Sequence, residues 1–415
     1  MKNKNFVNKI EQEPSKVITN IKRDKVIDKS TILKNFVQNE VVVTAENLDI
    51  LRGNGYFNLD RIREKIRCIR SMENKDVRDL STLNINIITW ADVDQRTYMC
   101  WGDYWVKERL TRYLREYFKS VNVDHNLADI SLYLFGSPFK PGVIRAPYNP
   151  MTFNVAWLYS HPDKFDGLEA LKYDLVMCLS KQYVNEVKKI HNNVHDTAII
   201  SCSDFTIPNI DYGSDNSLVM VANARGDMPG YGRGVVEYLV QLKNELESTV
   251  KVWGHKWENR EKYNLFPAEW YVGKYIDYNE LNSLYRGSKA VIIDGHGTME
   301  DNGFVPMKLF DVFASGGLPI IRYNSGINDI FGEYVLQYNN AEELKRCINV
   351  TRDREKCLEI IKLGNEVALK NTYYHRVKEI IEIIRKQIVI FNEENKLTSS
   401  KPVSVPKREI VWVND

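Results

Sequence analysis

Residues 290–321 read AVIIDGHGTMEDNGFVPMKLFDVFASGGLPII, and this stretch decides the fold. It opens with the short apolar run 290–294, which is typical of a buried strand. A polar segment interrupted by glycines follows, and apolar residues at helical spacing then predict a helix from near Phe304 to the Gly316-Gly317 pair. Residues 318–321 have the composition of a second buried strand. This order of strand, glycine loop, helix and strand predicts a parallel sheet with an anion site at the helix N-terminus.

Apolar runs and amphipathic segments alternate along the rest of the chain. The first series contains predicted strands at 83–89, 130–135, 154–159, 174–179 and 198–201, and a helix at 103–118. The second contains strands at 218–223, 250–254, 290–294 and 318–321, and helices at 233–246, 278–287, 341–350, 353–370 and 372–391. We therefore predict an α/β protein of two Rossmann-like domains, 84–209 and 218–390. An extension or cap at 1–83 precedes them, and a tail at 392–415 follows.

Length and composition exclude several classes of protein. A chain of 415 residues favours two domains, and its 43% hydrophobic and 27% charged residues are those of a soluble globular protein. A net charge of +2 argues against a dedicated nucleic-acid binder. The six cysteines form no CxxC pair, so they suggest neither a zinc site nor a disulfide framework. Without a recognisable signal peptide or long apolar run, we expect a cytoplasmic protein; peripheral membrane association is compatible with this.

The segment 303–316 resembles the donor-site element of GT-B glycosyltransferases. In that class the element reads Glu-Gly-Phe, five or six further residues, and then Glu-Ala-x-Ala-x-Gly. Gly303-Phe304 and Asp311-Val-Phe-Ala-Ser-Gly316 match it, with Asp in place of the second Glu. The first acidic position has no clean counterpart, because Glu300 and Asp301 lie near it but Asn302 directly precedes the glycine.

By motif, the nearest part of this class is the CgeB-like branch of the bacterial glycosyltransferase group 1. Its donor helix usually opens Ser-Asn-Arg-Leu-Phe-Glu, and residues 306–311, PMKLFD, keep part of that string. The resemblance covers roughly residues 84–390. It implies the GT-B fold, in which two Rossmann-like domains face each other across a cleft, with the nucleotide on the second domain and the acceptor on the first.

The resemblance implies a donor site on the second half. Arg225 follows the first strand of this half and Arg233 opens the next helix, where the family carries Arg and then Lys. Such cations would neutralise the departing diphosphate. Asp311 matches the acidic residue that accepts hydrogen bonds from the ribose hydroxyls, and a carboxylate can accept two at once. For the charged residues, the alternative is a solvated side chain without a ligand. The full set of donor candidates is Arg225, Arg233, His296, Gly303, Phe304, Val305, Lys308 and Asp311, with backbone N–H groups of 303–305 directed at the diphosphate.

Two residues of the first half are candidates for catalysis or acceptor binding. His161 ends a predicted strand within Tyr-Ser-His-Pro, which is similar to a recurrent string of the CgeB-like branch, and a histidine there can assist proton transfer. Asp103 follows Trp101-Gly102 in the first strand-to-helix connection, where it can bind the acceptor. The alternatives are a histidine that caps the following turn and an ordinary helix N-cap. Neither residue is assigned as the base, so the stereochemistry stays open.

A metal site is the competing way to stabilise the diphosphate. Asp92-Val-Asp94 matches the DxD motif of metal-dependent glycosyltransferases, but it follows the first strand in the wrong half for that fold. A lone DxD is also common by chance. We therefore expect transfer without a metal or another cofactor.

The expected function is that of a glycosyltransferase of the hexosyl or N-acetylhexosaminyl class. It would move a sugar from a nucleotide-diphosphate sugar to a glycan, glycolipid or protein acceptor. A nucleotide-sugar 2-epimerase shares the fold, although it would need several acidic residues in the cleft. An inactive sugar-binding or scaffold protein is the other alternative, because the acidic motif is incomplete.

Overall fold

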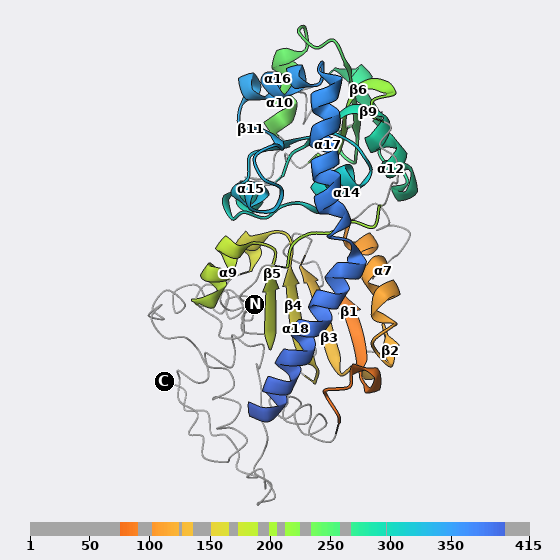
Figure 1. Ribbon diagram of the computed structural model, residues 1–415, viewed down its shortest axis with the longest axis vertical. Helices are drawn as coiled ribbons and strands as arrows, with labels where there is room; N and C mark the ends of the chain where they lie inside the picture. Colours follow the sequence, from red (N-terminus) through yellow and green to blue (C-terminus); the bar gives the residue numbers. More distant parts are fainter. Residues whose placement is uncertain are drawn as a thin grey trace, which may run out of the picture.

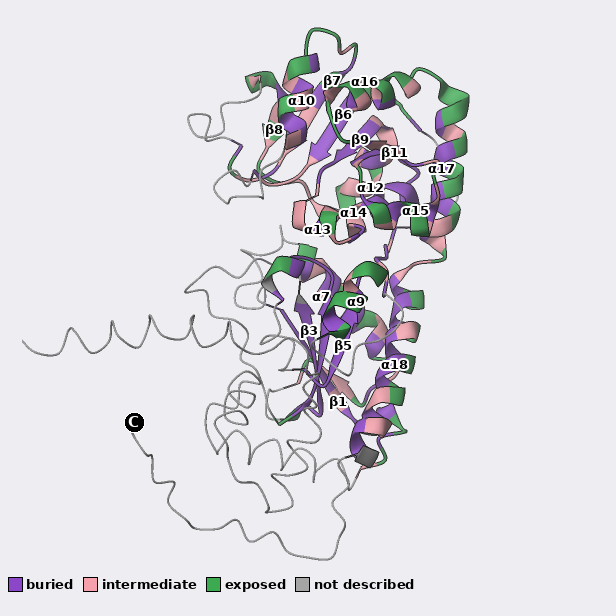
Figure 2. Cartoon of the chain, turned by 90° about the vertical axis from the view of Figure 1, so that its left-hand side faces the viewer, coloured by how far each residue is buried: buried purple, intermediate pink, exposed green. Residues whose placement is uncertain are grey.

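The structure is a computed structural model, and it describes residues 75–89, 102–123, 127–135, 151–165, 173–189, 199–205, 212–224, 234–257, 267–295 and 297–394. Two α/β halves lie one above the other along the long axis of the molecule (Figure 1). Each half has its own hydrophobic core, built mainly from the strands and from the inner faces of the helices. In Figure 2 the strands of both sheets are mostly buried, whereas α17 and α18 show both buried and exposed residues.

The first half is a five-stranded parallel sheet in the order β2-β1-β3-β4-β5. Strand β4, which lies between β3 and β5, is buried at every position, as expected where helices cover both faces of a parallel sheet. Its elements are η2 (Leu80–Thr82), β1 (Asn84–Ile88), α7 (Gly102–Leu114), β2 (Ser120–Val121), β3 (Ile130–Phe135), β4 (Phe153–Leu158), η5 (Pro162–Lys164), β5 (Leu175–Cys178) and α9 (Lys181–Lys188).

The second half is a six-stranded parallel sheet in the order β11-β10-β9-β6-β7-β8. The chain winds outward from β6 in one direction and from β9 in the other, which is the Rossmann order of strands. Its elements are β6 (Asp215–Val221), α10 (Gly234–Leu242), β7 (Thr249–Trp253), η6 (Ala268–Trp270), β8 (Tyr271–Gly273), α12 (Tyr278–Gly287), β9 (Ser288–Ile293), α13 (Gly297–Asp301), α14 (Met307–Ala314), β10 (Pro319–Arg322), α15 (Ser325–Phe331), β11 (Leu336–Tyr338), α16 (Ala341–Val350) and α17 (Arg354–Leu369).

The last described element is α18 (Tyr373–Glu394), a helix that returns to the first half and packs there. Phe391 packs edge-on against Phe153 of β4, with ring centroids 5.2 Å apart. The two segments that cross between the halves lie side by side, because Ser203 and Thr372 form a parallel bridge. The halves are therefore joined by a paired, double connection, which constrains how far they can move apart.

The predicted fold class is confirmed: two Rossmann-like domains face each other, as the GT-B resemblance implies. The main predicted strands and helices are also present, but residues 199–201 are not the predicted strand and form part of the crossover. The position of α18 differs from the prediction as well. The predicted domain 218–390 includes most of α18, but the apolar face of this helix completes the core of the first half. Nearly all of the predicted extension 1–83, and the tail from residue 395, lie outside the described residues.

Side-chain caps explain where several helices begin. Ser180, Asp277, Asn340 and Asp353 each accept a hydrogen bond from a backbone N–H two or three residues further along. Such caps satisfy N–H groups that have no partner within the helix. In the described part of the chain, no helix combines the length and the apolar character that a membrane span requires.

Close contact between α14 and α17 makes Gly364 a sensitive position. A Cβ atom on Gly364 would lie 2.1 Å from Cδ1 of Phe313, whose ring is fully buried. We expect Gly364→Ala to lower the free energy of unfolding by about 3 kcal/mol, measured by chemical denaturation, because the core is already filled. Gly102→Ala is the control: a Cβ there meets no atom within 4 Å, and alanine suits a helix better than glycine. Equal stability of the two variants would contradict this packing.

Candidate active site

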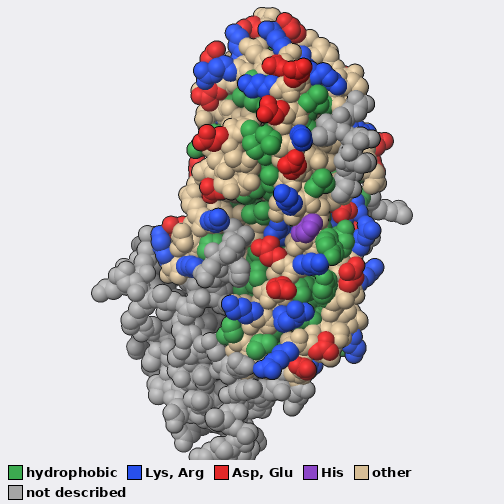
Figure 3. Space-filling model, in the orientation of Figure 1, with side chains coloured by type: hydrophobic (Ala, Val, Ile, Leu, Met, Phe, Trp, Pro, Cys, Tyr) green, Lys and Arg blue, Asp and Glu red, His purple; other side chains and the backbone are tan. Residues whose placement is uncertain are grey.

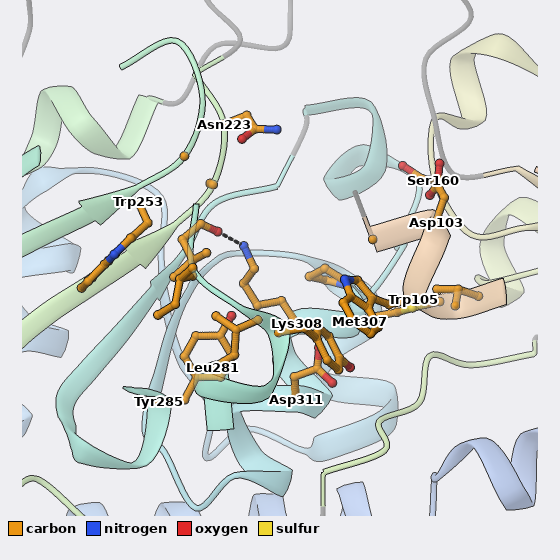
Figure 4. Close-up of a pocket in the computed structure, with 18 of the residues that line it drawn as sticks. Asp103, Trp105, Ser160, Asn223, Trp253, Leu281, Tyr285, Met307, Lys308 and Asp311 are labelled. Atoms are coloured by element: carbon orange, nitrogen blue, oxygen red, sulfur yellow. Dashed lines mark hydrogen bonds between the residues drawn. The ribbon is translucent and has the colours of Figure 1, made fainter. Parts of the chain in front are cut away.

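A cleft of about 350 Å³ lies between the two halves. Its walls are formed by residues at the carboxyl ends of β4, β6, β7 and β8 and by the first turns of α7 and α14 (Figure 4). Ligands of open α/β sheets bind at this edge, where neighbouring connections diverge to opposite faces. The cleft therefore lies between the loops that follow the carboxyl ends of the strands in both sheets.

Lys308 and Asp311 lie on the wall formed by the second half, both on α14. The Lys308 ammonium donates to the carbonyl oxygen of Val221 at the end of β6, and Figure 4 shows this bond spanning the floor of the cleft. Asn223, two residues beyond that carbonyl, accepts a bond of 2.9 Å from the backbone N–H of His255 through its side-chain oxygen. These contacts tie α14 to the loops that follow β6 and β7.

Asp311 connects the cleft to the crossover between the halves. Its Oδ1 accepts a hydrogen bond of 2.7 Å from the Ser203 hydroxyl. Burial raises the pKa of this carboxyl to about 7, while the Ser203 bond and the Lys308 charge oppose the rise. Asp311 therefore changes between acid and carboxylate near neutral pH, in a position where a ligand in the cleft can contact it.

The wall formed by the first half carries Asp103 and Ser160. Asp103, in the first turn of α7, is buried, and its Oδ1 accepts a hydrogen bond of 2.6 Å from the hydroxyl of Tyr159. Burial and the adjacent Asp103 carboxylate raise the pKa of Tyr159 well above its usual value, so Tyr159 remains a neutral donor. Figure 4 shows Asp103 and Ser160 across the cleft from Lys308.

His161 lies behind this wall, and it is not among the residues that line the cleft. Only 3% of its surface is exposed, and its backbone is left-handed, with φ of 53°. Its Nδ1 lies 2.7 Å from the hydroxyl oxygen of Ser160, which does line the cleft. Ser160 therefore links His161 to the cleft. The sequence did not identify Ser160 as a site residue.

The predicted anion site at residues 303–305 differs in the structure. An unpredicted short helix, α13, ends just before it, so the Gly303 N–H donates to Glu300 O at 3.1 Å and the Phe304 N–H to Met299 O at 2.8 Å. These two N–H groups are not directed at a diphosphate. Phe304 packs in the first core against Tyr183, and the Val305 carbonyl accepts a bond from Ser201. The three residues join the halves and do not line the cleft.

A partly buried charged cluster that the sequence did not predict lies beside this loop. Arg322, at the end of β10, forms an ion pair with Glu300 at 3.1 Å and lies 4.0 Å from Asp294. Burial raises the pKa of Glu300 to about 7, although the Arg322 charge opposes this. Glu300 stands near the first acidic position of the family element, and here its carboxylate accepts from the Gly295 N–H. The sequence could have indicated Arg322 as a site residue, because it is a charged residue at the end of an apolar strand.

Several predicted residues lie outside the described part of the chain. These are Arg225, Arg233 and His296 of the predicted donor site, and Asp92 and Asp94 of the DxD match. Within the described residues, no three His, Cys, Asp or Glu side chains group closely enough to hold a metal ion.

Sequence comparison finds a family match in the second part of the chain. Residues 235–382 match the sequence model of a family described as glycosyl transferase-like. This part of the chain is therefore similar to glycosyltransferases. The match confirms the predicted resemblance and the predicted enzyme class, glycosyltransferase, and it covers β7, α14 and most of the second wall of the cleft. The assignment to the CgeB-like branch stays a prediction. No curated protein is similar enough in sequence to count as a relative.

Solved glycosyltransferase structures are similar to the chain at low identity. The structure of T4 phage BGT with UDP and Mn²⁺ is 14% identical over 73% of this chain and 99% of its own, with a TM-score of 0.47. Sucrose-phosphate synthase from Thermosynechococcus elongatus is 10% identical over 72% and 81%, with a TM-score of 0.45. The GtfA/B complex is 11% identical over 62% of this chain, with a TM-score of 0.43, and this chain spans 57% of its length.

The charges of the cleft suit a two-substrate reaction. The second half contributes two lysines, Lys274 and Lys308, and the titratable Asp311. Among the described residues, the opposite wall contributes one carboxylate, Asp103, and the Ser160 hydroxyl. An anionic leaving group would be stabilised on the first of these walls and an attacking hydroxyl on the second.

Proposed function

We propose that this protein transfers a sugar from a nucleotide-diphosphate sugar to an acceptor hydroxyl within this cleft. One observation carries the proposal: Lys308 and Asp311, in the part of the chain that is similar to glycosyltransferases, lie across a single cleft from the carboxylate of Asp103. The donor would lie on the second half, with its diphosphate near Lys308 and its ribose hydroxyls at Asp311.

Charge stabilisation in this proposal comes from side chains. Lys308 is held at the switch point of the second sheet by the carbonyl of Val221, and Lys274 follows β8 on the same wall. Preorganised cations of this kind stabilise the charge that develops on a departing diphosphate. Arg225 and Arg233 would add to them. We therefore propose a reaction that needs no metal.

Asp103 is the proposed base. The acceptor hydroxyl attacks the anomeric carbon, the bond from that carbon to the diphosphate oxygen breaks, and the hydroxyl proton passes to the Asp103 carboxylate. A base on the face opposite the leaving group fits a single displacement that inverts the anomeric centre. The acceptor would be a glycan, glycolipid or protein with a free hydroxyl, used in the cytoplasm or at the membrane surface.

Calorimetry with UDP, GDP, dTDP and CMP and with their sugars tests the donor site. We expect one nucleotide series to bind, and binding to persist in EDTA. Asp311→Ala should weaken binding of that series without unfolding the protein. Failure of every nucleotide to bind would overturn the proposal. Conversion of UDP-GlcNAc without an acceptor would favour a 2-epimerase, and binding without any transfer or hydrolysis would favour an inactive sugar-binding protein.

Donor affinity should depend on pH through Asp311. The carboxylate accepts two ribose hydroxyls better than the acid does, and its pKa is about 7. If only the ionised form binds, affinity for the sugar nucleotide should rise about tenfold between pH 6 and pH 8. Asp311→Asn should bind weakly at both pH values. A wild-type affinity that is flat over this range would contradict the role of Asp311.

The raised pKa of Asp311 makes the stability of the fold change with pH in the direction opposite to that of donor affinity. The pKa of Asp311 in the folded protein lies above its ordinary value of 3.8, so the folded state holds the proton more tightly than the unfolded chain does. Its contribution to stability is therefore lost as the pH rises from about 4 to about 7. Asp311→Asn should remove this part of the pH dependence.

A further inference from the structure

One serine joins Asp311 to the connection between the halves. Ser203 is fully buried in residues 199–205, the first of the two segments that cross between the halves. Its hydroxyl oxygen accepts a hydrogen bond of 3.1 Å from the backbone N–H of Phe205 and lies 2.7 Å from Oδ1 of Asp311. A hydroxyl has one proton to donate and an ionised carboxylate can only accept, so this contact is strongest when Asp311 is ionised.

The backbone of Ser203 pairs with the second segment that crosses between the halves, residues 371–373. Its N–H donates to the carbonyl oxygen of Asn371 at 3.1 Å, and its carbonyl oxygen accepts from the N–H of Tyr373 at 3.3 Å. Ser203 is therefore bonded to α14 through its side chain and to the second crossing segment through its backbone. A change at the Asp311 carboxyl is passed through this one residue to both segments.

Other charged groups also face Asp311. Burial raises the pKa of this carboxyl to about 7, and the Ser203 bond is the strongest influence that opposes the rise. The charges of Lys308 in α14 and Arg109 in α7 also oppose it, whereas the charge of Asp204 adds to it. Burial raises the pKa of each remaining titratable group that faces Asp311, so these groups stay uncharged while Asp311 titrates: Tyr278, Tyr285, Tyr373 and Cys202.

We propose that Ser203 is a positioning residue of the donor site, which keeps Asp311 in the ionised form that accepts the ribose hydroxyls and links donor binding to the two crossing segments. A carboxylate has about four lone-pair sites, so it can accept from Ser203 and from a ligand at once. Asp311 itself lines the cleft, whereas Ser203 does not. This inference rests on the proposed transferase function and adds to it the residue that joins the donor site to the connection between the halves.

The first test measures the affinity of Ser203→Ala for the nucleotide sugar that binds best in the calorimetric series, between pH 6 and pH 9. A nucleotide sugar is used because its diphosphate has no terminal phosphate that titrates near neutral pH. The variant loses a donor to the ionised form, so the pKa of Asp311 should rise. If it rises by about one unit, affinity should fall about fivefold at pH 7 and should stay close to that of the wild type at pH 9.

Ser201→Ala is the matched control. Ser201 is fully buried in the same segment, and its hydroxyl donates to the carbonyl oxygen of Val305 at 2.8 Å, so the variant loses a buried hydrogen bond that does not involve Asp311. Its affinity should depend on pH as that of the wild type does. Ser203→Thr keeps a hydroxyl and should restore most of the affinity at pH 7.

A second measurement needs no ligand. The pKa of Asp311 in the folded protein is raised above its ordinary value of 3.8, so its contribution to stability is lost as the pH rises to about 7. In Ser203→Ala this loss should continue to higher pH, so chemical denaturation should show a larger stability deficit at pH 9 than at pH 6. In the Asp311→Asn background, Ser203→Ala should produce a deficit that does not change over this range.

Hydrogen exchange tests the link to the connection between the halves. Saturation with the nucleotide sugar at pH 7 should slow amide exchange in both crossing segments of the wild type and of Ser201→Ala, and should do so less in Ser203→Ala saturated to the same degree.

Three results would overturn the inference: an unchanged pH profile in Ser203→Ala, a loss of affinity by the same factor at every pH, or an equal loss in Ser201→Ala. Exchange that responds alike in the two variants would remove the link to the crossing segments. Failure of every nucleotide sugar to bind would instead defeat the proposed function, and the denaturation series would still decide whether Ser203 controls the ionisation of Asp311.

Discussion

Asp103→Asn is expected to lower kcat for sugar transfer by about 10²–10⁴-fold while leaving the affinity for the nucleotide unchanged. Asparagine keeps the size of the side chain and can still accept the 2.6 Å bond from Tyr159, but it cannot take a proton from the acceptor. The nucleotide is proposed to contact the opposite wall, so its affinity does not depend on this carboxylate. Steady-state transfer assays, together with calorimetry of the same preparation, measure both quantities.

Tyr159→Phe is the matched control for this experiment. It removes the hydroxyl that donates to Asp103 and leaves the carboxylate in place, so transfer should fall less than in Asp103→Asn. Ser160→Ala removes the group through which His161 reaches the cleft. If Asp103→Asn keeps wild-type kcat while Ser160→Ala loses it, the base lies on the Ser160–His161 side and the assignment of Asp103 is wrong.

The sequence predicted the parts of the fold that depend on long apolar periodicity. Residues 290–294 and 318–321 are paired neighbours in the second sheet, as the opening stretch indicated. The strands and α-helices that were missed are β8 and β11 at the two edges of that sheet, the two-residue β2, and the short helices α9, α13 and α15. Three-residue edge strands carry too few apolar positions to show alternation, so a pattern cannot identify them.

The site residues were likewise predicted only in part from the sequence. Lys308 and Asp311, two of the predicted donor residues, line the cleft, and they lie on a helix that the apolar spacing of the sequence predicted. The N–H groups of Gly303 and Phe304 were misassigned because α13, five residues long, takes them as its terminal partners. The Trp105–Tyr278 stack joins residues from different halves, and no local pattern reports such a contact.

The face in Figure 3 shows acidic and basic side chains interspersed, a distribution that net charge alone does not reveal.

The second large effect is expected at Gly254, where β7 enters the cleft. We expect Gly254→Ala to lower kcat/KM by about 100-fold, because displacement of site residues by about 1 Å has effects of this size. Gly254 has φ of 147°, and a Cβ atom on it would lie 2.1 Å from the carbonyl oxygen of Ala222. The methyl group must therefore push Ala222 away, and Ala222 directly follows Val221, whose carbonyl positions Lys308.

Gly273→Ala provides the comparison that isolates this cause. Gly273 lies directly beside Gly254, whose N–H donates to the Gly273 carbonyl at 2.9 Å. The nearest atom to a Cβ on Gly273 is 4.0 Å away, so alanine fits there without displacing the backbone. Gly254→Ala should therefore lose nucleotide affinity in calorimetry and about 3 kcal/mol of stability, whereas Gly273→Ala should keep both. Equal losses in the two variants would mean that this edge of the sheet tolerates no side chain at all, and that the register between the β6 and β7 loops is not what positions Lys308.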